Sequence, residues 1–160
     1  MKNCAVTQAV CNPSINLAQD SYASQNEGMR AQSDYSKLVL VVDDDPDIRE
    51  TVREILEEQG YRVDDAENGR EALGRLRSGS TPDLILLDLS MPVMSGPEFC
   101  SERQKDPKLS RIPVVVVTAT GNPEQKVAKL PINGLLRKPV GLDELLGTVE
   151  RFCGCGQGIN

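Results

Sequence analysis

The sequence contains no histidine among its 160 residues. No imidazole can therefore act as a general base, carry a phosphoryl group or bind zinc, and Ser–His and Cys–His catalysis are excluded. The chain has 18 basic residues and 24 acidic residues, which gives a net charge of −6. This charge argues against a stand-alone nucleic-acid-binding protein, because phosphate contacts need a basic surface. No apolar run approaches the length of about 18 residues that a transmembrane helix needs, and neither a G-x-G-x-x-G nor a P-loop pattern is present.

The five cysteines are odd in number and scattered along the chain, at positions 4, 11, 100, 153 and 155. Such a set argues against a secreted disulfide framework, and the N-terminus has no convincing signal peptide. We therefore expect reduced thiols and a cytoplasmic protein. A metal-binding or redox role for the closely spaced pair Cys153 and Cys155 is left open.

Composition divides the chain into three parts. Residues 1–35 are polar and show no sustained periodicity, so we predict a disordered N-terminal extension. Residues 36–152 carry the apolar runs of one folded domain, and residues 153–160 form a Gly- and Cys-rich C-terminal tail. Because so few residues follow the domain, we expect a stand-alone unit without an effector module.

Predicted strands and amphipathic segments alternate five times along the predicted domain. Continuous apolar runs at residues 37–42, 83–87 and 112–117 are typical of strands covered on both faces, and shorter strands are predicted at residues 61–66 and 134–137. The predicted helices begin at Asp45-Pro46, Arg70, Pro97, Glu124 and Leu142. The fourth, over residues 124–130, should be short because Pro131 ends it. This alternation predicts a doubly wound α/β fold, with a parallel sheet covered by helices on both faces.

Polar side chains stand where the predicted strands end. Asp43 and Asp44 follow the first strand, Asp88 the third, Thr118 the fourth and Lys138 the fifth. The carboxyl ends of parallel strands form one crevice, where ligands bind. Close carboxylates need a cation between them, and hard oxygen ligands suit Mg²⁺. A carboxylate beside Mg²⁺, a lysine and a hydroxyl predicts phosphoryl transfer through an aspartyl phosphate.

Four ordered motifs carry a resemblance to a known family. They are LVVDDDP at residues 40–46, PDLILLDLSMP at 82–92, VTA at 117–119 and RKP at 137–139. Together they resemble the receiver domain of two-component response regulators, over residues 37–152. The resemblance implies a flavodoxin-like (βα)₅ fold, a doubly wound five-stranded parallel sheet with strand order 2-1-3-4-5.

The resemblance also implies an acceptor and a metal site. Asp88 corresponds to the aspartate that accepts a phosphoryl group from a phosphohistidine. Asp43 and Asp44 resemble the acidic pair that holds Mg²⁺ with Asp88, directly or through water. Ser90 lies where the family supplies a backbone carbonyl to the metal.

The remaining motif residues correspond to the switch machinery of the family. Thr118 resembles the hydroxyl that turns toward the phosphoryl group, and Lys138 resembles the lysine that pairs with it. Pro139 follows Lys138 through what is a cis peptide bond in the family. Leu135 departs from the pattern, because the family often has Tyr or Phe there.

The implied function is that of a single-domain response regulator. Its phosphoryl donor would be a sensor histidine kinase or a histidine phosphotransfer protein, and its output a contact with an unknown downstream protein or onward transfer in a phosphorelay. We expect no nucleic-acid or membrane partner, a monomer or weak phosphorylation-dependent dimer, and no enzyme activity beyond self-catalysed phosphorylation and slow autodephosphorylation.

Two alternatives compete with this interpretation. A pseudo-receiver would bind partners without phosphorylation. This alternative stays open because Leu135 replaces the aromatic residue that is usual in the family. A haloacid-dehalogenase-like phosphohydrolase would use Asp43 as its nucleophile, but its later acidic motif should follow the lysine. Here Asp88 precedes Lys138, so the motif order disfavours the hydrolase.

Overall fold

The computed structural model describes residues 36–154 of the chain. The strands are β1 (Leu38–Val42), β2 (Arg62–Ala66), β3 (Leu84–Leu87), β4 (Val114–Thr118) and β5 (Gly134–Arg137). They pair in parallel in the order β2-β1-β3-β4-β5. The helices are α1 (Pro46–Glu58), α2 (Gly69–Arg77), α3 (Gly96–Gln104), α4 (Pro123–Val127) and α5 (Leu142–Cys153), with a 3₁₀ turn, η2 (Leu109–Arg111). The predicted doubly wound fold and strand order are thus confirmed.

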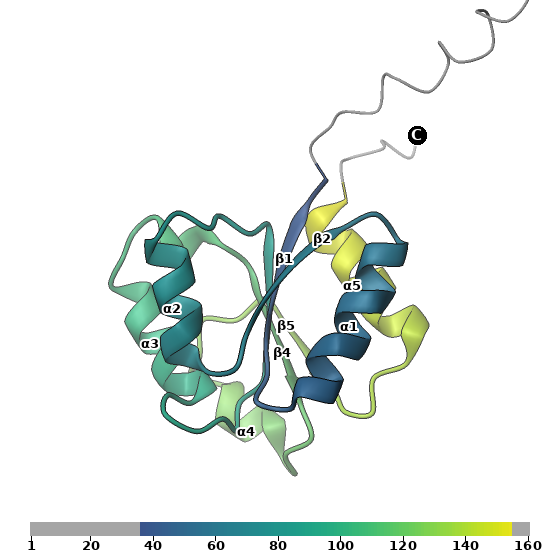
Figure 1. Cartoon of the computed structure of the whole chain (residues 1–160). Helices are drawn as coiled ribbons and strands as arrows, with labels where there is room; N and C mark the ends of the chain where they lie inside the picture. Colours follow the sequence, from purple (N-terminus) through teal and green to yellow (C-terminus); the bar gives the residue numbers. More distant parts are fainter. Residues whose placement is uncertain (1–35, 155–160) are drawn as a thin grey trace, which may run out of the picture. The chain divides into compact units, whose positions relative to one another are not determined.

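Helices cover both faces of the sheet, with α1 and α5 on one side and α2 and α3 on the other (Figure 1). Successive side chains of a strand point to opposite faces, so β1 feeds both cores. Leu40 and Val42 pack with the α2–α3 side, whereas Val39 and Val41 pack with the α1–α5 side. This two-sided burial explains why β1, β3 and β4 read as continuous apolar runs.

Several boundaries differ from the sequence-based predictions. Helix α4 spans only Pro123–Val127, shorter than the predicted residues 124–130, and η2 was not predicted. Helix α5 runs to Cys153, one residue past the predicted end of the domain. The predicted extension over residues 1–35 and most of the predicted C-terminal tail lie outside the described residues. No helix within residues 36–154 is both long and apolar enough to cross a membrane.

Cys100 and Cys153 are free, buried thiols on opposite faces of the sheet. Burial raises the pKa of each to about 11. Both thiols are therefore protonated near neutral pH and are poor nucleophiles or metal ligands. This argues against a metal-binding role for Cys153, while Cys155 lies outside the described residues.

Asp45 begins α1 and thereby directs the chain away from the end of β1. Its Oδ1 accepts hydrogen bonds from the backbone N–H groups of Asp47, at 2.9 Å, and Ile48, at 3.4 Å. Pro46 occupies the first helical position, where its missing N–H costs nothing. The helix therefore starts immediately after Asp43 and Asp44 and fixes where this acidic loop lies.

A buried arginine anchors the connection from α3 to β4. The Arg103 guanidinium donates to the carbonyls of Leu109, Ser110 and Ile112 and to that of Pro131, after α4. Since Arg103 is only 2% exposed, these carbonyls take the place of water around its charge. One side chain thus holds together η2, the residue that follows it and the loop after α4.

Gly96 allows the first turn of α3 to approach the end of β3 closely. A Cβ at this position would lie 2.6 Å from the backbone oxygen of Asp88 and 2.9 Å from the Cα of Leu89. Both neighbours are main-chain atoms, so neither can rotate away. Gly74, within α2, provides a contrast, because a Cβ there would meet no atom within 4 Å.

We expect Gly96→Ala to lower the free energy of unfolding by about 1–3 kcal/mol, because the methyl group overpacks the end of β3. Gly74→Ala, the matched control, should raise it by about 0.5–1 kcal/mol, because alanine has the higher helix propensity. Urea unfolding of both variants measures the two changes. Equal changes in both variants would contradict the close-approach role of Gly96.

Candidate functional site

Two buried aspartates meet at the carboxyl ends of the neighbouring strands β1 and β3. Val42 and Leu87 are register partners, so the next residues, Asp43 and Asp88, emerge side by side. The Asp88 N–H donates to the Val42 carbonyl at 2.8 Å. Asp43 is 4% and Asp88 6% exposed. The sheet register therefore brings together two carboxylates that lie 45 residues apart in the sequence.

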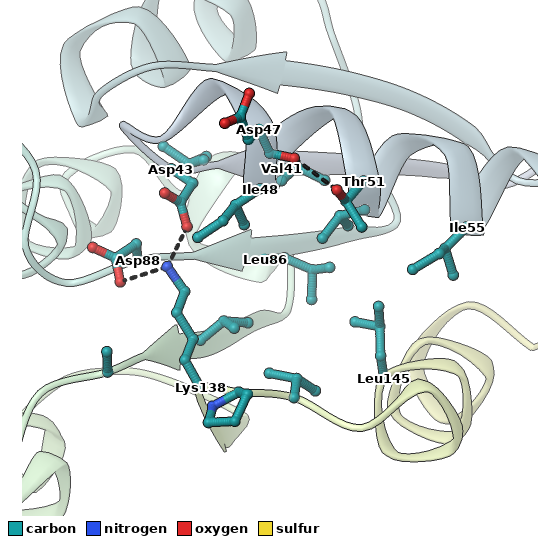
Figure 2. A pocket seen from close by; sticks show the side chains of 16 residues that line it. Val41, Asp43, Asp47, Ile48, Thr51, Ile55, Leu86, Asp88, Lys138 and Leu145 are labelled. Atoms are coloured by element: carbon teal, nitrogen blue, oxygen red, sulfur yellow. Dashed lines mark hydrogen bonds and ion pairs between the residues drawn. The ribbon is translucent and has the colours of Figure 1, made fainter.

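Lys138, directly after β5, supplies the cation between these carboxylates (Figure 2). Its Nζ donates to Asp43 Oδ2 at 2.5 Å and lies 3.4 Å from Asp88 Oδ1. Its backbone N–H donates to the carbonyl of Thr118, at 3.0 Å. Main-chain bonding thus fixes where the lysine leaves the sheet, and its side chain reaches back over the strand ends.

The environment of Lys138 favours its charged form. Burial acts to lower the pKa of the ammonium, but the hydrogen bond and charge of Asp43, with the charge of Asp88, outweigh burial and raise that pKa. Opposite charges in a poorly solvated site interact more strongly than in water. The ammonium is therefore a fixed positive charge at the site.

Hydroxyl groups form a chain beside Asp88. The Ser90 N–H donates to Asp88 Oδ2 at 2.8 Å. The Ser90 hydroxyl lies 3.4 Å from that of Thr120, which lies 3.1 Å from the hydroxyl of Thr118. Thr118 is thus engaged by Thr120, a residue that the sequence analysis did not single out. Its one signal was its place two residues after Thr118, in the loop that ends β4.

A second residue that the sequence analysis missed is Arg49 on α1. Its guanidinium donates to the backbone carbonyl of Asp43 at 2.7 Å and to Asp65 Oδ2, on β2, at 3.2 Å. No sequence pattern singled it out, because an arginine on an amphipathic helix usually lies in solvent.

The donor set of the two buried carboxylates fits a magnesium ion. They share one ammonium, which leaves an excess of negative charge, and Mg²⁺ typically takes one or two carboxylates and completes its shell with water. The third predicted ligand, Asp44, is exposed. Within residues 36–154, no group of three or more acidic or cysteine side chains lies close enough to hold an ion. The Ser90 carbonyl stays a prediction.

A cavity of about 550 Å³ opens beside these residues, between α1 and α5. Figure 2 shows Asp43, Asp88 and Lys138 gathered at one end and apolar side chains, such as Ile55 and Leu145, at the other. The three paired charges of Asp43, Asp88 and Lys138 thus lie at one end of the cavity. An apolar wall next to charged groups limits their solvation and strengthens their interactions.

The residues around Lys138 follow the expected pattern in one respect and depart from it in another. The Lys138–Pro139 peptide bond is cis, as the motif implied. Leu135, where an aromatic residue was the usual expectation, is half-buried in β5. Arg137 forms an exposed ion pair with Glu124 of α4.

Comparison with known proteins gives a consistent result. The family model of the response regulator receiver domain matches residues 39–150. An uncharacterized 14.6 kDa protein of Leptolyngbya boryana is 38% identical over 117 residues, which cover 72% of this chain and 88% of that protein. Response regulator MprA of Mycolicibacterium vanbaalenii is 41% identical over 114 residues, 70% of this chain and 48% of that protein. The chain thus spans about half the length of the MprA regulators that it matches.

Solved structures agree. Chemotaxis response regulator CheY4 of Vibrio cholerae has a TM-score of 0.68 and 34% identity, covering 74% of this chain and 99% of that chain. Response regulator TrrA of Thermotoga maritima, solved in complex with Mg²⁺ and BeF, has a TM-score of 0.65 and 38% identity, covering 72% of this chain and 98% of that chain.

Lys138 gives the stability of the domain a predictable pH dependence. Because its pKa is raised in the folded state, its contribution is complete below the unfolded pKa of about 10.4 and is lost as the pH rises through the folded value. We expect Lys138→Met to lower the free energy of unfolding at neutral pH, with the difference from wild type shrinking above about pH 10.4. Urea unfolding across this range measures it.

Lys105→Met is the matched control, because Lys105 pairs with Glu102 on the surface and its side chain is 67% exposed. Exposed pairs contribute little, so this variant should match the wild type throughout. A Lys138→Met difference that persists unchanged at high pH would contradict the role given to the ammonium.

Proposed function

The chain belongs to the response regulator receiver domain family, and on that basis we propose that it accepts a phosphoryl group on Asp88. Receiver domains of this family act in two-component signalling, in which they interact with histidine kinases or histidine phosphotransfer proteins. The proposal assigns this chain the same chemistry, with Mg²⁺ as cofactor. TrrA of Thermotoga maritima, a relative solved with Mg²⁺ and BeF, supports that choice.

The observation that carries the choice of Asp88 is the difference between the two buried aspartates. Asp43 is held at both carboxylate oxygens, by the Asp45 N–H at 3.0 Å and by Lys138 at 2.5 Å. Asp88 has one well-held oxygen, Oδ2, bound by the Ser90 N–H at 2.8 Å. Its Oδ1 has only the longer 3.4 Å contact to Lys138. Asp88 Oδ1 is therefore the oxygen most available to attack phosphorus.

The chemical step is a displacement at phosphorus. An Asp88 oxygen forms the new P–O bond while the donor's bond to phosphorus breaks and its electron pair leaves with the donor. Lys138 balances the charge of the phosphoryl oxygens, and the Thr118 hydroxyl donates to one of them after leaving Thr120. Asp88, the Ser90 backbone carbonyl and the pair Asp43 and Asp44, directly or through water, would hold a Mg²⁺ ion that neutralises the remaining charge.

A phosphohistidine donor would lie outside these 160 residues, because they contain no histidine. We propose a sensor histidine kinase or a histidine phosphotransfer protein as donor. The output is then contact with a downstream protein, or onward phosphotransfer, by a monomer or a weak phosphorylation-dependent dimer. A cytoplasmic site of action fits the free buried thiols Cys100 and Cys153.

The pseudo-receiver is the second candidate, and Leu135 is the observation that favours it. A half-buried leucine in place of the usual aromatic residue removes one familiar readout of phosphorylation. It leaves the acceptor chemistry of Asp88 untouched, so the two functions differ in a single measurable property, the uptake of a phosphoryl group.

We expect acetyl phosphate with Mg²⁺ to add one phosphoryl group to the wild-type protein, seen by intact-mass spectrometry, and chelation of Mg²⁺ to prevent the addition. Asp88→Asn should abolish it, because an amide oxygen is a far weaker nucleophile. Asp47→Asn is the matched control, since Asp47 lines the same cavity but is exposed on α1. This variant should be phosphorylated like the wild type.

Other outcomes point to other functions. A mass gain that persists in Asp88→Asn would direct attention to Asp43 and revive the phosphohydrolase. The absence of any gain in the wild type, with small donors and with phosphohistidine donors, would favour the pseudo-receiver.

A further inference from the structure

Arg49 makes a contact with the acidic site that the acceptor chemistry does not use. We propose that Arg49, oriented by Asp65, is a positioning residue that keeps Asp43 in its metal-binding geometry when Lys138 moves to the phosphoryl group. The inference rests on the proposed function, because it concerns the same Mg²⁺ site. It adds a residue on α1 and its partner on β2 to the machinery.

Asp43 is restrained at each of its four polar atoms. Its N–H donates to the Ala66 carbonyl at 3.2 Å, and its own carbonyl accepts from Arg49 at 2.7 Å. Oδ1 accepts from the Asp45 N–H at 3.0 Å, and Oδ2 from Lys138 at 2.5 Å. The bonds with Ala66, Arg49 and Asp45 each use a main-chain atom of Asp43 or of Asp45. The bond with Lys138 joins two side chains.

The two cations that touch Asp43 have different roles. Lys138 occupies Oδ2, the Asp43 carboxylate oxygen without a main-chain donor, so a metal ion bound at that oxygen would compete with the lysine. Arg49 uses the backbone carbonyl and leaves both carboxylate oxygens to other partners. The Arg49 contact could therefore persist when metal and phosphoryl group are bound, whereas the Lys138 contact would be in competition with them.

Arg49 is itself held in place. Its Nε donates to Asp65 Oδ2 at 3.2 Å, and its side chain is 17% exposed. Asp65 is held in turn by Arg53, one turn further along α1, through its other oxygen. The planar guanidinium can make both bonds at fixed angles, which a lysine ammonium cannot reproduce. The network thus ties α1 and β2 to the end of β1.

Charge and positioning predict opposite effects of removing Arg49. If its positive charge were all that mattered, its removal would strengthen binding of a cation nearby. If its hydrogen bond positions Asp43, its removal should weaken binding, because loss of an outer-shell partner typically costs 10–100-fold in metal affinity. The sign of the change therefore separates the two effects.

The experiment measures Mg²⁺ binding by isothermal titration calorimetry in the unphosphorylated full chain. We expect Arg49→Met to raise the dissociation constant about 10-fold. Arg70→Met is the matched control, because Arg70 is exposed in the first turn of α2, after the carboxyl end of β2, and lies outside the network of Arg49, Asp65 and Arg53. It should leave the dissociation constant unchanged or slightly lower. Arg49→Lys retains the charge without the fork and should resemble Arg49→Met.

A second readout separates positioning from a general structural role. In the acetyl phosphate reaction, Arg49→Met should need about 10-fold more Mg²⁺ for half-maximal phosphorylation and reach the wild-type rate at saturating Mg²⁺. Urea unfolding without Mg²⁺ checks that the variants are folded. Asp65→Asn, which weakens the orienting contact, should shift the Mg²⁺ requirement in the same direction by a smaller factor.

The outcomes distinguish this inference from the proposed function. Wild-type binding of Mg²⁺ with equal or tighter binding by Arg49→Met would overturn the positioning role and leave the proposed function intact. A lower maximal rate in Arg49→Met with an unchanged Mg²⁺ requirement would also overturn it. A wild-type chain that neither binds Mg²⁺ nor takes up a phosphoryl group would overturn both.

Discussion

The burial of two carboxylates side by side is the constraint on which the rest of the site depends. Asp43 and Asp88 lie at the ends of strands that pair in register, so the sheet itself brings them together. Like charges in a poorly solvated place repel one another and resist burial. The Lys138 ammonium, directly after β5, and the backbone N–H donors of Asp45 and Ser90 offset this repulsion.

This compensation is incomplete, and the chemistry follows from that. One ammonium faces two carboxylates, while the main-chain donors bring no net charge. The site therefore attracts a further cation, and an added phosphoryl group could be accommodated only with that cation present. The α1–α5 cavity keeps apolar side chains against the charged end, which prevents water from screening it fully. The same imbalance would thus account for both the proposed metal binding and the proposed phosphoryl acceptance.

The parts that the sequence predicted are those that depend on local pattern. Continuous apolar runs identified β1, β3 and β4, and strand ends in a parallel sheet share one edge. The sequence pattern alone was therefore enough to predict that Lys138 lies near Asp43. The sequence analysis did not identify Thr120 and Arg49, because their contacts depend on side-chain direction and on which loops lie close together. The length of α4 and the turn η2 also depend on tertiary contacts, such as the hydrogen bonds that Arg103 donates to carbonyls next to both elements. Sequence periodicity does not reveal such contacts.

The two sides of the site are held by different numbers of hydrogen bonds. This difference indicates which side would move if a group were added to Asp88. The end of β1 is bound on every side, through Arg49, Asp45 and Ala66. The loop after β4 depends on hydroxyl contacts of 3.1 and 3.4 Å, and α4 beyond it has only 5 residues. Its ion pair from Glu124 to Arg137 is exposed at both side chains, and such pairs add little stability. A group that draws Thr118 away from Thr120 would therefore displace the β4–α4 side, while the end of β1, where we propose that the metal binds, stays fixed.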